Sequence, residues 1–264
     1  MNGLSDETIV ELWDMIFNIS QNMLHDENDA KDATQTIFEK IIDKYSDFKG
    51  HSKLSTWAYR IAFNYLVDIK RSSSVSEISF EIFEHDVNIF TPYQNEFGLN
   101  REEEKIFAEE VKVGCTLAML QCLDYESRFI YILGSIFNFT GKEASEICKM
   151  EPVTYRKKLS RAKLKINSFM GKNCGLINPD AICRCRKRIL IAKERGRIDM
   201  EKLMYQTENR HIKDIIREMN EIDVISKVFQ SNPYFENHDD EISRIKEKFK
   251  ILQETQIKSI NQEI

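Results

Sequence analysis

The chain of 264 residues is 42% hydrophobic and 31% charged with a formal net charge of −5, which is typical of about two soluble globular domains. No stretch approaches the roughly 20 apolar residues that a membrane span needs, and the N-terminus lacks the pattern of a signal peptide, so we expect a cytoplasmic protein. Only four prolines and nine glycines are present and strand-like alternation is scarce, so we predict an all-α fold.

The first predicted domain, residues 1–75, contains several helices with one polar break at residues 46–53. The helix predicted after this break mixes aromatic side chains with cations and an amide; these residues are Trp57, Tyr59, Arg60, Phe63, Asn64, Tyr65, Lys70 and Arg71. Aromatic rings among cations suit single-stranded nucleic acid, because a base can stack on a ring while a cation meets its phosphate. Trp57 and Ile61 could equally be core residues.

The second segment, residues 76–108, is predicted to be an acidic linker. From Ser72 to Glu110 there are ten acidic residues against two basic ones, and Pro92 and Gly98 interrupt any long helix. From Thr154 to Arg195 the balance is reversed, with thirteen Lys or Arg against two acids. Because a phosphate backbone responds to local charge, the negative whole-chain charge does not exclude nucleic acid.

The third segment, residues 109–172, contains a predicted helix-turn-helix between Thr140 and Lys163. Ala144 and Ile147 face inward on a short helix, and Pro152 suits the first turn of a second, basic helix. Such a helix can enter a major groove, where residues near its N-terminus reach base edges and later cations meet phosphates. The candidates are Thr154, Arg156, Lys157, Lys158, Ser160, Arg161 and Lys163. The alternative is a surface helix whose lysines are only solvated.

The last segment, residues 173–264, combines clustered cysteines with two amphipathic helices. Cys174, Cys183 and Cys185 could hold a metal or act as a thiol sensor, but the usual two-residue spacing and a fourth ligand are missing, so we expect no cofactor. The three-and-four spacing of apolar residues predicts helices over about 212–229 and 242–252, which we expect to form an antiparallel hairpin.

The motifs of residues 29–71 resemble domain two of the extracytoplasmic-function sigma factors of bacterial RNA polymerase. These motifs are Asp-x-x-Asp-x-x-Gln-x-x-Phe, beginning at Asp29, and Phe-x-Gly-x-Ser-x-x-Ser-Thr-Trp-x-Tyr-Arg-Ile-Ala, beginning at Phe48. Residues 153–163 are similar to the second helix of their domain four. Lys149, however, stands where a turn glycine is usual, so the turn must tolerate a side chain.

The resemblance implies roles for these residues. The first helix would dock on core RNA polymerase through Asp29, Asp32, Gln35 and Phe38. The residues that would hold the opened minus-ten promoter element are Lys49, Ser52, Lys53, Trp57, Arg60, Asn64 and Arg71. The basic helix would recognise the minus-thirty-five element, the acidic linker would pass through a polymerase channel, and an anti-sigma factor is a candidate partner.

Two other classes of protein compete with this interpretation. The first is a helix-turn-helix regulator that binds duplex DNA without polymerase, and the second is a metal- or redox-sensing regulator that uses Cys174, Cys183 and Cys185. An enzyme is not expected, because the sequence contains no glycine-rich phosphate loop, metalloprotease pair or nucleophile elbow. Binding to core polymerase would separate the first class from a sigma factor.

Overall fold

The computed structural model describes residues 5–69, 78–89, 98–201, 203, 224–235 and 242–251. These residues form α-helices and short 3-10 or π turns, and their one β pairing is an isolated bridge between Cys174 and Cys183. The predicted all-α class is therefore confirmed. None of the described helices is long and apolar enough to cross a membrane.

The chain divides into two compact units. Unit 1 comprises Met1–Ser73, Ser145–Met150 and Tyr234–Ile264, and unit 2 comprises Ser74–Ala144 and Glu151–Pro233. Each unit is therefore built from segments that are distant in the sequence.

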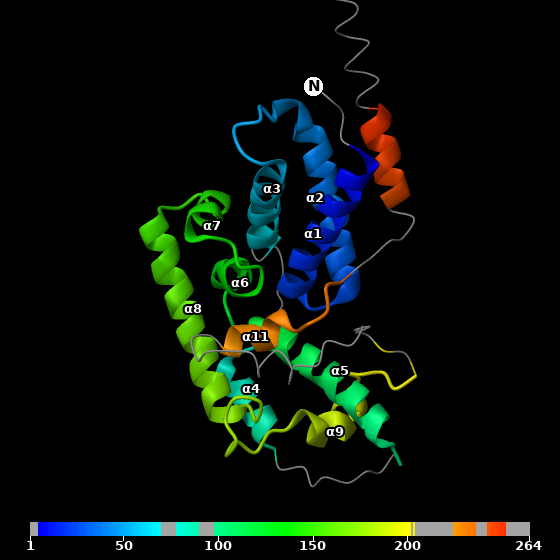
Figure 1. Cartoon of the computed structure of the whole chain (residues 1–264), viewed down its shortest axis with the longest axis vertical. Helices are drawn as coiled ribbons and strands as arrows, with labels where there is room; N and C mark the ends of the chain where they lie inside the picture. The colour runs from blue at the N-terminus through cyan, green and yellow to red at the C-terminus, as the bar shows by residue number, and fades with distance from the viewer. Residues whose placement is uncertain are drawn as a thin grey trace, which may run out of the picture. The chain divides into compact units, whose positions relative to one another are not determined.

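Unit 1 contains a three-helix arrangement, coloured blue to cyan in Figure 1; its elements are α1 (Asp6–Leu24), α2 (Glu27–Lys44), η1 (Tyr45–Asp47) and α3 (Leu54–Asp68). The side chain of Ser5 caps α1, and that of Asp26 caps α2 by accepting from two backbone N–H groups. The predicted polar break at residues 46–53 separates α2 from α3, as expected.

The core of unit 1 is apolar side chains from all three helices. Trp13 of α1 and Phe38 of α2 are 1% and 0% exposed, and their ring centroids are 5.2 Å apart. Small side chains on α3, Ala58 and Ala62, are fully buried and let that helix approach closely. This packing fixes which face of each helix remains at the surface.

Unit 2 is organised around two long helices. Its elements are α4 (Phe80–Asn88), α5 (Arg101–Leu120), α6 (Tyr125–Tyr131), the π turn η3 (Ile132–Ile136), α8 (Pro152–Asn173), η4 (Cys185–Arg188), α9 (Ile189–Glu194) and α11 (Val224–Gln230). Asn100 and Glu103 form a reciprocal capping box at the start of α5. At its other end, buried Arg128 donates to the carbonyls of Leu120 and Leu123.

The predicted acidic linker is folded where the structure describes it. Phe80, Phe83 and Val87 recur at helical spacing behind the N-cap Ser79, so residues 80–88 form α4. The ring of Phe83 stacks on Phe169 of α8, with centroids 5.2 Å apart and planes 2° apart. Residues 101–108 begin α5. The segment predicted as an acidic linker is therefore helical at residues 80–88 and 101–108.

The acidic residues of this segment pair with basic residues of unit 2. Asp86 of α4 forms ion pairs with Arg188 at 3.5 Å, with Arg197 at 2.7 Å and with Arg195. Elsewhere, Glu84 pairs with Lys172 at 2.5 Å and Glu104 with Arg186 at 3.7 Å. The charge segregation seen in the sequence is thus partly neutralised inside the unit.

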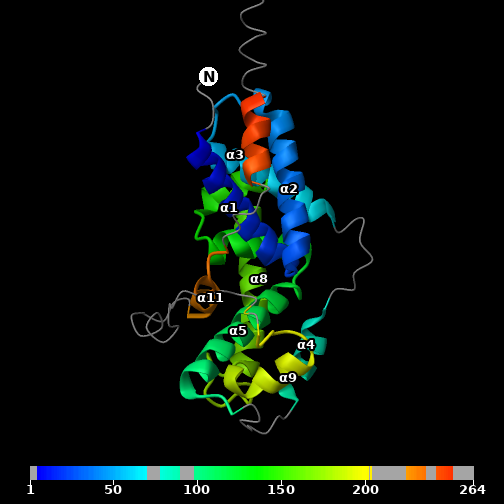
Figure 2. The ribbon, with the colours of Figure 1, turned by 90° about the vertical axis from the view of Figure 1, so that its right-hand side faces the viewer.

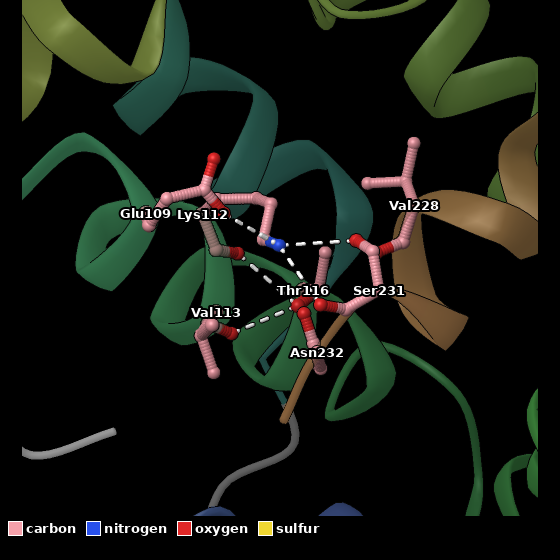
Figure 3. Close-up of polar contacts among 7 residues, drawn as sticks. All are labelled: Glu109, Lys112, Val113, Thr116, Val228, Ser231 and Asn232. Atoms are coloured by element: carbon pink, nitrogen blue, oxygen red, sulfur yellow. Dashed lines mark hydrogen bonds and ion pairs between the residues drawn. The ribbon is translucent and has the colours of Figure 1, made fainter. Parts of the chain in front are cut away.

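The start of the C-terminal extension is anchored on unit 2. The ring of Phe229 on α11 packs edge-on against Tyr131, with centroids 5.4 Å apart. Figure 3 shows buried Lys112 donating to the Ser231 hydroxyl at 3.0 Å and pairing with Glu109 at 2.8 Å, while the Asn232 amide donates to Thr116 at 2.8 Å. Polar anchors of this kind fix the segment that follows α11.

The predicted antiparallel hairpin falls largely outside the described residues. Its first helix is described only from Val224, because residues 204–223 lie outside the described residues. The second helix, residues 242–251, belongs to unit 1, whereas α11 belongs to unit 2. The pairing of the two predicted helices stays a prediction.

Candidate nucleic-acid interface

The loop before α3 places polar side chains at the surface. Lys49 and Lys53 are exposed and Ser52 is half-buried. Between them Gly50 has a φ of 72°, a left-handed backbone conformation that glycine adopts without steric cost. The loop therefore places two exposed lysines next to the start of α3.

One face of α3 continues this surface. Trp57, Arg60 and Asn64 are three and four residues apart, so they lie on the same side of the helix. Trp57 and Arg60 are half-buried and Asn64 is exposed. The Arg60 Nε is buried and has no hydrogen-bond acceptor among the described residues. Arg71, predicted to extend the surface, lies outside the described residues.

Aromatic side chains pack against one side of the Trp57 ring. The centroid of its ring is 5.3 Å from that of Phe48 in the loop, and Phe48 stacks on Tyr45 of η1 at 6.5 Å. Tyr45 is itself 8% exposed. Trp57 is thus held by the loop on one side while part of its ring stays accessible, which is the arrangement that stacking on a base requires.

The exposed face of α2 carries only part of the predicted polymerase-docking motif. Asp29 and Asp32 are exposed, and Gln35 is half-buried. Phe38 is fully buried against Trp13. Because nine helical steps of about 100° place Phe38 opposite Asp29, its predicted contact with polymerase does not fit the structure, and it serves the core.

The predicted helix-turn-helix segment has the expected elements. α7 (Gly141–Ile147) buries Ala144 and Ile147 completely, and Pro152 occupies the first turn of α8. Between the helices Lys149 has a φ of 50° and is exposed. The turn therefore keeps the left-handed conformation that glycine would favour, and a lysine side chain adopts it.

The recognition candidates on α8 are mostly at the surface. Tyr155, Ala162 and Ile166 are buried along one side of the helix. The exposed candidates are Thr154, Arg156, Lys157, Ser160 and Arg161, whereas Lys158 and Lys163 are half-buried. Lys158 forms an ion pair with Glu126 of α6, which removes part of its charge from any phosphate contact.

Two apolar residues on α8 were missed by the sequence prediction. Val153 is 52% exposed and Leu164 is 70% exposed, and both lie on the side that carries Arg156 and Ser160. Val153 stands in the first turn of the helix, where base contacts are usual. An apolar side chain there can contact a thymine methyl group. The signal was present in the sequence as an apolar residue off the buried face.

The cysteine segment gathers more thiols than the sequence suggested. Burial raises the pKa of the Cys115 thiol on α5, and repulsion from Cys183, Cys185 and Cys174 raises it further, so these four thiols lie near one another. The segment closes on itself through a hydrogen bond of 3.0 Å from the Gly175 N–H to the Cys183 carbonyl. A Cβ on Gly175 would lie 2.4 Å from that oxygen, which only glycine avoids.

Burial disfavours the thiolate form of these cysteines. Burial is the largest cause of the raised pKa of Cys174, Cys183 and Cys185, and a raised pKa lowers the fraction of nucleophilic thiolate. Among the described residues no three His, Cys, Asp or Glu side chains are arranged so that they could hold a metal ion. Nearby Arg184 donates instead to the carbonyl of Cys183 at 3.0 Å.

Comparison with known proteins places the helices of unit 1 in a family. Residues 9–75 match the family model described as Sigma-70 region 2. A probable RNA polymerase sigma factor of Haemophilus influenzae is 20% identical over 180 residues, covering 65% of this chain and 92% of its own length. The RNA polymerase sigma factor YlaC of Bacillus subtilis is 24% identical over 163 residues, covering 62% and 90%.

A solved structure is also similar, namely the co-crystal structure of the sigma factor RpoE with the anti-sigma factor NepR from Bartonella quintana. Its TM-score is 0.43 and its sequence identity 16%, and the match covers 62% of this chain and 94% of that chain. The region 2 match spans α1, α2 and α3, which carry the surface described above. Residues 9–75 thus match a sigma-70 region 2, and about two thirds of the chain is similar to RNA polymerase sigma factors.

Proposed function

We propose that this chain is a sigma factor that uses unit 1 to dock on core polymerase and hold the opened minus-ten strand, and α8 to recognise the minus-thirty-five duplex. The observation that carries the proposal is the coincidence of the region 2 match, residues 9–75, with a surface on which half-buried Trp57 is followed by Arg60 and Asn64. Promoter recognition by two modules then explains why this surface and the basic helix α8 occur in one chain.

Docking on polymerase is proposed for the exposed face of α2. Asp29 and Asp32 present carboxylates one turn apart, and Gln35 adds a partly accessible amide on the next turn. Two exposed carboxylates favour a basic partner surface and would increase the rate of encounter with it. Phe38 is left out of this docking surface because it is buried.

Capture of an unpaired base is proposed for the loop and the Trp57 face. Extruding a base costs a few kcal/mol of stacking and pairing, which ring stacking and phosphate contacts can offset. Lys49 and Lys53 are exposed at the surface where phosphates of the strand would pass, while half-buried Trp57 offers a stacking platform. Sequence-dependent opening of the minus-ten element follows from this capture.

Duplex recognition is proposed for the first two turns of α8. Thr154, Arg156 and Lys157 are exposed near its N-terminus, the end that reaches base edges in helix-turn-helix proteins. Ser160 and Arg161 follow one turn later and are placed for phosphates. Val153 joins the base-reading group through its exposed methyl groups.

The competing function is a helix-turn-helix regulator that acts without polymerase, and retention on immobilised core polymerase distinguishes the two. We expect the wild-type chain to be retained, and Asp29→Lys with Asp32→Lys to weaken retention at least tenfold by replacing attraction with repulsion. Glu11→Lys, at an exposed acid of α1, is the matched control and should bind normally. A wild-type chain that is not retained would favour the ordinary regulator.

A cellular location and one further partner follow from the same proposal. Because core polymerase works in the cytoplasm, we propose that the chain acts there. We also propose an anti-sigma factor as a partner, as in the complex of RpoE with NepR. Co-purification of a second chain with the tagged protein at endogenous level would identify it.

A further inference from the structure

The C-terminal helix 242–251 is an integral part of unit 1. In both views it lies beside α1 and α2, drawn in red (Figures 1 and 2). Ile242, Ile245 and Phe249 recur at helical spacing and are 6%, 3% and 0% exposed. The helix therefore buries a continuous apolar face in the unit that carries the region 2 match.

Polar contacts tie the same segment down at several points. The amide side chain of buried Asn18 donates to the Phe235 carbonyl at 2.6 Å and accepts from the Phe235 N–H at 2.8 Å. Along the helix, Lys246 pairs with Asp6 of α1 at 3.7 Å, and Lys248 pairs with Glu39 of α2 at 3.2 Å. The two lysine ion pairs set the position of the helix along α1 and α2, while the apolar face and the hydrogen bonds of Asn18 hold the segment in place.

A chain of aromatic rings leads from this helix to the proposed DNA surface. Phe249 packs edge-on against Tyr45, with centroids 5.7 Å apart and planes 88° apart. Tyr45 then stacks on Phe48, and Phe48 packs on Trp57. Tyr45 belongs to η1, directly before the loop of residues 48–53, so its position sets where that loop starts.

We propose that Phe249 is a positioning residue for promoter opening: through Tyr45 and Phe48 it holds the loop and Trp57 in the geometry that captures an unpaired base. The inference rests on the proposed function of unit 1. It assigns the C-terminal helix a supporting role rather than a blocking one. Asp29 and Asp32 of α2 are exposed with this helix in place, so the Lys248 contact with Glu39 leaves these two carboxylates of the proposed docking face accessible.

The test compares Phe249→Leu and Phe249→Ala with Ile242→Val, a matched change on the same buried face about 10 Å away along the helix. Leucine keeps the site apolar but removes the ring edge from Tyr45. Binding of core polymerase is measured first. Binding of the fluorescently labelled minus-ten strand of a mapped promoter to the assembled holoenzyme is measured second.

We expect both Phe249 variants to bind core polymerase within twofold of wild type and to lose at least fivefold in affinity for the single strand. Acrylamide quenching of tryptophan fluorescence should also increase, because Trp13 is 1% exposed and the signal therefore reports Trp57. Ile242→Val should leave both readouts unchanged. Equal loss in the Ile242 variant would show a general packing effect and would overturn the positioning role.

Unchanged strand affinity and unchanged quenching in Phe249→Leu would also overturn the inference. A wild-type holoenzyme that binds no promoter strand would instead refute the proposed function. In that case the quenching comparison still decides whether Phe249 holds Trp57. If Phe249→Ala fails to fold, Phe249→Leu keeps the question decidable.

Discussion

Phe38 and Trp57 show how burial decides which residues of a motif can make contacts. Both belong to sequence patterns that predicted contacts at the surface, yet Phe38 is 0% exposed and Trp57 is half-buried. The helical angle between Asp29 and Phe38 was available from the sequence and already placed them on opposite sides. The exposure of Trp57 could not be predicted from the sequence, because it depends on the packing of Phe48 from a neighbouring loop.

Replacing Trp57 by alanine should impair promoter opening more than duplex binding. The ring is the proposed stacking platform for an unpaired base, and such stacking is worth about 1–3 kcal/mol per base. Permanganate reactivity of unpaired thymines, compared with a footprint of the closed complex, measures the two steps separately. Trp57→Phe retains a stacking ring and should recover part of the opening; equal loss of opening and duplex binding would contradict the assignment.

Replacing Arg156 by alanine should weaken minus-thirty-five recognition by about 1–3 kcal/mol if its guanidinium contacts a base edge. Arg156 is exposed near the N-terminus of α8, whereas Lys172 on the same helix pairs with Glu84. Lys172→Ala is therefore the control and should have little effect. A footprint that is unchanged in Arg156→Ala would show that the register of the recognition helix is wrong.

The buried thiols predict a loss of stability at alkaline pH. Burial raises the pKa of Cys115 and Cys185 in the folded chain above the value of about 8.5 that a thiol has in water. Above that pH the folded chain retains protons that the unfolded chain has lost, so their contribution is complete below pH 8.5 and falls as pH rises.

Thermal unfolding at pH 8 and pH 10 measures this effect. We expect Tm to fall between these values, and to fall less in a variant with Cys115→Ala and Cys185→Ala. Cys122, whose pKa is raised by burial to about 11, is present in both proteins and therefore contributes equally to the pH dependence of each. An identical pH dependence of Tm in the two proteins would contradict the burial of these thiols.

At the scale of elements, helices were predictable and their partners were not. Pro152 and the apolar spacing located the two helices of the helix-turn-helix, since each is a local property of the chain. The role of α4 was missed because its ten acidic neighbours suggested a solvated linker, whereas Asp86 is surrounded by arginines about 100 residues later. The closeness of Cys115 to the later cysteines is likewise a long-range contact that spacing does not reveal.

The turn between α7 and α8 predicts a stabilising substitution. Lys149 has a φ of 50°, a region that costs a side chain roughly 1–2 kcal/mol, whereas glycine adopts it freely but loses more backbone entropy on folding. Lys149→Gly should therefore increase the free energy of unfolding by about 0.5–1 kcal/mol in chemical denaturation. Lys142→Gly, an exposed residue in the first turn of α7, should have the opposite sign.

At the scale of the whole molecule, the distribution of charge is more informative than its sum. The formal net charge is −5, but Asp86 of α4 pairs with Arg188, Arg195 and Arg197 inside unit 2. Exposed cations are found on α8 and in the loop before α3 among the described residues. These two groups of cations carry the proposed DNA contacts of a chain that is acidic overall.

Transcription from genomic DNA by core polymerase and the full chain, with sequencing of the RNA 5′ ends, tests the sigma-factor assignment most directly. We predict a limited set of start sites, each preceded by two shared sequence elements. The element nearer the start site is opened, and the more distant one stays duplex. Trp57→Ala should reduce initiation at all of these sites. Initiation that is absent at every site, with core polymerase shown to be active with another sigma factor, would contradict the account.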